Sequence, residues 1–120
     1  MNKSFINLIN KLFEARQMAH NEHLRTNKFS AHKALQKFYE DINDLVDEIV
    51  EVYQGEFGII EFATEIKAQQ IDIIKYLESV AKMLKNANAA LKGSHSHYKN
   101  ILDEMTALTY RTVYKLKFLS

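Results

Sequence analysis

The chain has 120 residues, a formal net charge of +1, 47% hydrophobic residues, and neither cysteine nor proline. This length supports one domain with a single modest core. Disulfides, thiolate metal sites and cysteine nucleophiles are excluded, and the balanced charge argues against a nucleic-acid partner. No apolar run approaches the roughly 20 residues needed to cross a bilayer, and the N-terminal residues do not read as a secretion signal. We therefore expect a cytoplasmic, all-α protein with no membrane partner.

Apolar residues recur every three or four positions through most of the chain, a pattern typical of helices packed in a bundle. Four helices are expected, at about residues 4–25, 31–54, 70–91 and 96–118. On a helical wheel, His20 falls within the apolar arc of the first helix. The second helix has the clearest stripe, formed by Leu35, Phe38, Ile42, Leu45, Ile49 and Val52.

Gly55 and Gly58 interrupt the pattern, and a connection is expected at about residues 55–69. The apolar segment from Ile59 to Ile66 either extends the third helix or forms a short connecting helix. The two options give different topologies, a simple up-down bundle or a bundle with one crossover. We favour the break, and hence the crossover.

Four side chains that bind metals lie between residues 20 and 51: His20, His32, Asp47 and Glu51. Two imidazoles and two carboxylates suit non-haem Fe, Mn or Zn, and helical bundles build metal sites from such residues. The wheel places Asp47 and Glu51, an i,i+4 pair, away from the apolar stripe. A metal held there needs ligands from elsewhere, most naturally from a second subunit. Taken alone, two such acidic residues usually belong to a solvated face.

Three further residues near this set have weaker claims. His23 lies one turn after His20 and could chelate a metal or orient a metal-bound imidazole. Gln36 lies one turn after His32 and is a neutral, poorer ligand. Tyr39 could take an electron during iron oxidation, although amphipathic packing also explains it.

The order of these residues, with Phe29, Ala31, Ala34 and Phe38 between them, resembles the Dps-type mini-ferritins. Those proteins have one His late in the first helix, a second His at the start of the next, and an Asp-x-x-x-Glu further along. The gaps from His20 to His32, then to Asp47 and Glu51, fit that pattern without an insertion. The resemblance covers about residues 15–58.

The resemblance implies a ferritin-like four-helix bundle with a metal site shared across a two-fold dimer. His20 and His32 would come from one subunit, and Asp47 and Glu51 from its partner. It also implies that Fe(II) is bound and oxidised by dioxygen or peroxide, which would make the protein a ferroxidase-type oxidoreductase. The implied assembly is a homo-oligomer, a dimer at least and a closed shell in the family.

The chain departs from the family at several positions. Gln36 stands where the family usually has a carboxylate, which favours one metal per site, and Asn21 replaces a common Trp. The shorter connection suits a shortened, phage-type relative, located in the host cytoplasm. The alternative is a non-catalytic ferritin-like bundle that acts as a structural or protein-interaction module.

Overall fold

The computed structural model describes residues 2–63, 65–67 and 71–120, and in these ranges the chain is all-helical. The helices are α1 (Asn2–Arg25), α2 (Phe29–Phe57), α3 (Ile73–Ala90) and α4 (Ser96–Phe118), with a short 3-10 turn, η1 (Gly93–His95), before α4. The predicted four-helix bundle is thereby confirmed. None of the helices described is both long enough and apolar enough to cross a membrane.

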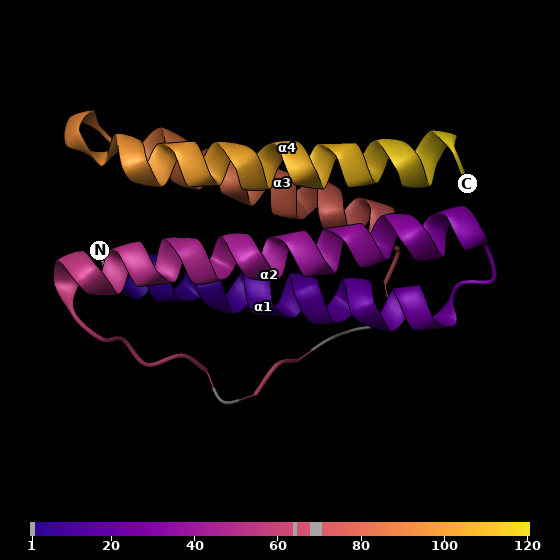
Figure 1. Ribbon diagram of the computed structural model, residues 1–120, viewed down its shortest axis with the longest axis horizontal. Helices are drawn as coiled ribbons and strands as arrows, with labels where there is room; N and C mark the ends of the chain where they lie inside the picture. The colour runs from indigo at the N-terminus through magenta and orange to yellow at the C-terminus, as the bar shows by residue number, and fades with distance from the viewer. Residues whose placement is uncertain (1, 64, 68–70) are drawn as a thin grey trace.

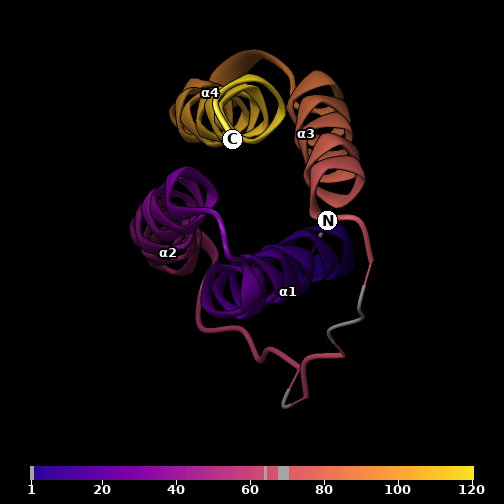
Figure 2. The ribbon, with the colours of Figure 1, turned by 90° about the vertical axis from the view of Figure 1, so that its right-hand side faces the viewer.

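The four helices form two antiparallel pairs stacked on each other (Figure 1). Helix α1 packs along α2, and α3 along α4; the contacts of α2 with α4 and of α1 with α3 close the square. Figure 2 looks along the bundle and shows one helix at each corner. Helix α2 ends at the end of the bundle opposite to that where α3 begins, so α2 and α3 run in the same direction. The bundle therefore has one crossover, as favoured by the break in the sequence pattern.

The crossover passes outside α1 (Figure 2) and contains no helix in its described residues, so the optional connecting helix is absent there. Two interactions hold it against α1. The ring of Phe62 packs edge-on against Phe13, with centroids 5.5 Å apart. The backbone N–H of Ala63 donates to Asn10 Oδ1 at 3.1 Å. Phe62 thus covers Phe13 on the outer side of α1, whereas Ile59 and Ile66 stay exposed at 84% and 41%.

Local hydrogen bonds set both ends of the crossover. Helix α2 continues through Gly55 and ends at Phe57, where Gly58 adopts φ 102° and donates its N–H to the Gln54 carbonyl. A positive φ of this kind favours glycine, which has no Cβ to clash. Helix α3 begins after Asp72, whose carboxylate caps the N–H groups of Ile74 and Lys75. The predicted start of this helix, residue 70, lies outside the described residues.

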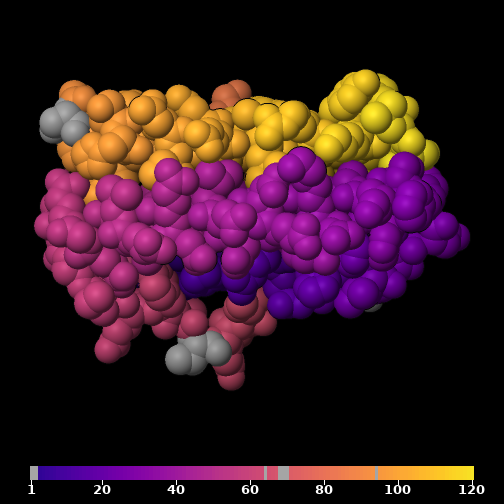
Figure 3. Space-filling view, in the orientation of Figure 1, coloured from indigo at the N-terminus to yellow at the C-terminus, as the bar shows by residue number. Residues whose placement is uncertain are grey.

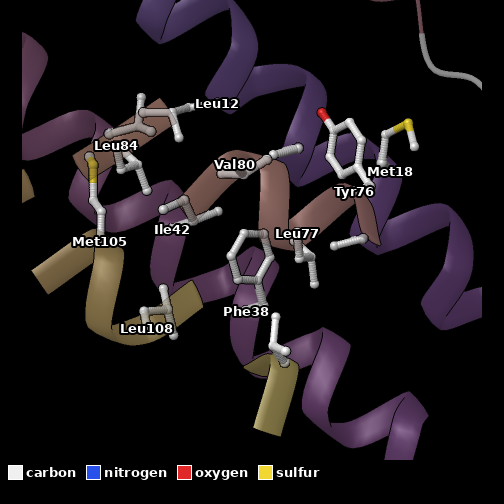
Figure 4. Packing of buried hydrophobic residues seen from close by; sticks show 14 of the residues in the cluster. Leu12, Met18, Phe38, Ile42, Tyr76, Leu77, Val80, Leu84, Met105 and Leu108 are labelled. Atoms are coloured by element: carbon white, nitrogen blue, oxygen red, sulfur yellow. The ribbon is translucent and has the colours of Figure 1, made fainter. Parts of the chain in front are cut away.

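The core is formed by one stripe from each helix, and Figure 4 shows these side chains meeting between the four ribbons. Along α2 the predicted stripe is right at four positions, but Val46 and Tyr53 are buried where Leu45 and Val52 were expected. An α-helix has 3.6 residues per turn, so a strict seven-residue repeat drifts around its surface. In α2 the buried positions therefore shift by one residue, from 45 to 46 and from 52 to 53. The buried stripe consists of Leu35, Phe38, Ile42, Val46, Ile49 and Tyr53.

A tyrosine–carboxylate hydrogen bond ties α3 to α1. The Tyr76 hydroxyl donates to Glu14 Oε1 at 2.6 Å, and Lys11 donates to the same oxygen at 2.7 Å. In Figure 4 the Tyr76 hydroxyl turns towards the α1 ribbon. Partial burial alone would raise the pKa of Glu14, but the hydrogen bonds from Lys11 and Tyr76 and the charge of Lys11 together lower it. Burial, followed by the bond to Glu14, raises the pKa of Tyr76.

Replacing Tyr76 by Phe is expected to lower the free energy of unfolding by about 1–2 kcal/mol at neutral pH. The pKa of Glu14 is lower in the folded chain than its ordinary value of 4.5. The stabilisation is therefore fully present above that ordinary value and is lost as the pH falls through the folded pKa. Urea unfolding at neutral pH and at about pH 3 should show the difference between wild type and Tyr76→Phe shrinking in acid. The control is Tyr114→Phe, at an exposed tyrosine. If Tyr76→Phe lowered the free energy of unfolding equally at both pH values, the assigned hydrogen bond from Tyr76 to the Glu14 carboxylate would be contradicted.

Candidate metal site

The turn between α1 and α2 brings three histidines and one tyrosine together. His20 and His23 lie in the last turns of α1, His32 in the first turn of α2, and Tyr39 two turns further on. The rings of His23 and His32 stack with centroids 3.6 Å apart, and His20 stacks on Tyr39 at 4.3 Å. His20 and His23 are 5.9 Å apart. The two histidines predicted as ligands therefore belong to one aromatic cluster within a single chain.

His23 and His32 are locked by a reciprocal pair of hydrogen bonds to backbone. His23 Nδ1 lies 2.7 Å from the His32 carbonyl oxygen, and His32 Nδ1 lies 2.8 Å from the His23 carbonyl oxygen. A carbonyl oxygen only accepts, so each Nδ1 carries the hydrogen and donates. In the neutral ring this leaves Nε2 with its lone pair. Metal-binding histidines are commonly oriented in this way, by a carbonyl on the other ring nitrogen.

The position of His20 differs from the prediction. His20 is exposed, whereas His23 is buried with 7% of its surface exposed. The wheel placed His20 on the same arc as Phe13, which is only partly buried at the edge of the core and packs against Phe62 of the crossover. The core side of α1 instead follows Ile9, Leu12, Ala15 and Ala19, and His23 continues it one turn later. His20 is thus an accessible imidazole.

Asp47 and Glu51 lie far from this cluster on the same chain. Both are exposed, on a face of α2 away from the core, as the wheel predicted. In Figure 3, α2 runs across the middle of the face shown, so this helix is open along its length. Asp47 follows His32 by four helical turns, a distance of about 22 Å. Within the described part of the chain no three metal-binding side chains converge on one point.

Gln36 lies one turn after His32 and is half-buried. Its amide donates to Glu40 Oε2 at 3.4 Å, a long hydrogen bond between two residues on the same face of α2. The stacking of Tyr39 on His20 and the bonds between His23 and His32 were not predicted from the sequence. The spacing of His23, three residues after His20, was the available signal, but the backbone bonds depend on how the turn folds.

The fold and these side chains define an all-α four-helix bundle with a histidine cluster at one end and an acidic pair on an exposed helix face. The chain belongs to a family of unknown function, DUF5856, whose profile matches residues 23–116. The match runs from His23 to near the end of α4, so it includes His32, Asp47 and Glu51 but not His20. No curated protein and no solved structure matches the chain significantly.

Proposed function

We propose that the protein is an oligomeric metal-binding protein that takes up Fe(II) at a centre completed between two copies of the chain. One copy supplies His20 and His32, and the other supplies Asp47 and Glu51. The observation that carries the proposal is the hydrogen bond from His32 Nδ1 to the His23 carbonyl, which fixes the ring and leaves Nε2 of the neutral imidazole with the lone pair that a metal needs. The exposure of Asp47 and Glu51 agrees with a role between subunits. The single crossover is also the connectivity of ferritin-like bundles.

The proposed chemistry follows from the donor set. Neutral imidazole nitrogen and carboxylate oxygen together favour Fe(II), Mn(II) or Zn(II) over Ca(II) or Mg(II), which prefer oxygen alone. Gln36 adds no negative charge, so the centre holds a single ion. Fe(II) is the substrate, and dioxygen or peroxide accepts its electron. The protein's part is to fix the ligand geometry and exclude side reactions.

The direct test is an anaerobic calorimetric titration of Fe(II) into the wild type and into the double variant His32→Ala/Glu51→Ala. Air or peroxide is then admitted, and iron oxidation is followed by absorbance. Binding that the double variant abolishes, with rapid oxidation in the wild type, is expected. The matched control is Asp44→Ala/Glu48→Ala, another exposed i,i+4 acidic pair on α2, which should bind like the wild type. Binding that survives in the double variant would contradict the assigned ligands, and a wild type that binds no metal would overturn the function.

His23 gives a prediction of its own, because the proposal makes it the residue that orients His32. Replacing His23 by Phe keeps a ring that can stack on His32 but removes the Nδ1 donor to the His32 carbonyl. The His23 backbone carbonyl that accepts from His32 Nδ1 is unchanged in this variant, so only the return bond that steadies the turn is lost. Metal affinity is therefore expected to fall by up to about 10-fold, the lower end of the loss that follows removal of an orienting partner itself. Calorimetry with Zn(II), which needs no anaerobic handling, measures this change. His97→Phe, at an exposed histidine at the opposite end of the bundle, should leave the affinity unchanged; the same affinity in both variants would count against the orienting role.

A second candidate function, a helical interaction module without a metal, is favoured by one observation. Three aromatic side chains one turn apart, Tyr110, Tyr114 and Phe118, are exposed on α4 at 45%, 54% and 71%. Exposed aromatic rows of this kind mark protein contacts. A monomer in sedimentation of the purified protein would favour this second function, because a monomer cannot complete a shared metal centre.

A further inference from the structure

The end of the bundle opposite the histidine cluster carries a partly open cavity of about 280 Å³. It lies between the first turns of α1, the last turns of α2 and α3, and the start of α4, the end where the chain begins in Figure 1. Its lining is predominantly apolar. The volume is roughly twice the 150 Å³ of an apolar cavity that holds one benzene ring. Two fused rings therefore match the space.

Aromatic side chains form one wall of the cavity. Phe5 and Tyr53 stack in parallel, with centroids 4.0 Å apart and an angle of 6° between their planes, and Phe57 lies 4.9 Å from Tyr53. On α3, the lining residues Ala87 and Ala90 have short side chains, which leaves the space open. Aromatic rings in the lining favour an aromatic guest, because offset and edge-on ring pairs add attraction beyond simple burial.

The rim of the cavity carries a hydrogen-bond acceptor, His95. His95 Nδ1 lies 2.7 Å from the Lys92 carbonyl oxygen and must donate to it, so Nε2 of the neutral ring is an acceptor. The hydroxyl of Tyr98, which also lines the cavity, already donates to Glu56 Oε1 at 2.7 Å. A guest that donates one hydrogen bond therefore matches this rim better than one that only accepts.

We propose that this cavity binds a small, planar, two-ring aromatic molecule that carries one N–H or O–H donor, with His95 accepting the hydrogen bond. Indole is the probe that represents this class. The site is at the opposite end of the bundle from the histidine cluster and does not depend on metal binding.

The proposal is tested by titrating indole into the 120-residue protein and monitoring the NMR chemical shifts of the backbone amides. Saturable shifts of residues around the cavity and a raised Tm are expected. Indene, which has the shape of indole but no N–H donor, should bind about fivefold more weakly. In His95→Ala the two ligands should bind equally. No saturable binding of either ligand would overturn the site, and equal binding to the wild type would overturn the role of His95.

Filling the cavity provides the complementary test. Ala87→Leu places a larger side chain into the space, and Ala90→Leu does the same from the rim should the first variant pack poorly. Either folded variant should bind indole at least about tenfold more weakly without a loss of Tm, since a cavity is filled rather than created. The matched control is Ala89→Leu, on the same helix but exposed and away from the lining. Unchanged affinity in both filled variants would place indole elsewhere and overturn the proposal.

Discussion

A mixture of two inactive variants, His20→Ala/His32→Ala and Asp47→Ala/Glu51→Ala, is expected to recover about one quarter of the wild-type metal-binding capacity. Each variant alone should bind less than about a tenth as much, because its sites lack half of their ligands. In a random mixture, a site is intact only when its histidines come from the second variant and its carboxylates from the first. That combination occurs at about one site in four in any assembly built from two-fold interfaces.

The mixture must be unfolded and refolded together so that the subunits exchange, and binding is measured as Zn(II) retained after gel filtration. The two variants refolded separately and then combined serve as the control, and they should show no recovery. A site within one chain would give no recovery after joint refolding either, because each chain would still lack half of its ligands. That result, or full binding by either variant alone, would contradict a shared centre.

Phe38→Ala is expected to lower the free energy of unfolding by about 3–5 kcal/mol. The side chain of Phe38 is fully buried on α2 (0% exposed), and Figure 4 shows it among core residues of the neighbouring helices, including Leu77 and Leu108. Removing the ring loses the transfer free energy of the buried surface and leaves a cavity that the helices fill only in part. The free energy of unfolding of a small domain is about 5–15 kcal/mol, so this loss is a large share of the total stability. Urea denaturation followed by circular dichroism measures it.

The matched control lies on the same helix. Phe29, the first residue of α2, is 76% exposed, and Phe29→Ala should change the free energy of unfolding by no more than about 0.5 kcal/mol. Equal effects of the two substitutions would mean that the core does not pack as described. A changed denaturant slope in Phe38→Ala would instead show that the unfolded or native state had altered in compactness.

Much of the bundle could be predicted from the sequence because the information is local. Apolar spacing identified all four helices, and the glycines at 55 and 58 indicated the break that the crossover fills. The end of α2 was placed too early, because Gly55 is tolerated within the helix and only Gly58, with its positive φ, terminates it. The connecting helix that the sequence left open is absent from the described residues for a different reason. Ile59 to Ile66 is apolar because part of it covers α1, as the contact of Phe62 with Phe13 shows.

The candidate site was predictable in its residue types and spacing but not in its arrangement. The outward position of Asp47 and Glu51 followed from the period of α2 alone. The accessibility of His20 and the burial of His23 could not be predicted in this way. Both depend on which side of α1 faces the other helices and which side the crossover covers. The cavity at the far end depends on four helix ends meeting, where Ala87 and Ala90 line the space together with aromatic residues of other helices.

The sequence by itself determined the helices, the buried stripe of α2 apart from its drift, and the four side chains that could bind a metal. These features depend on the period of one helix and on the chemistry of each side chain. Only the tertiary structure decided the parallel course of α2 and α3 and the hydrogen bonds that lock His23 to His32. Those features arise between segments that are distant in the chain or joined by a turn, where packing and hydrogen-bond satisfaction outweigh local pattern.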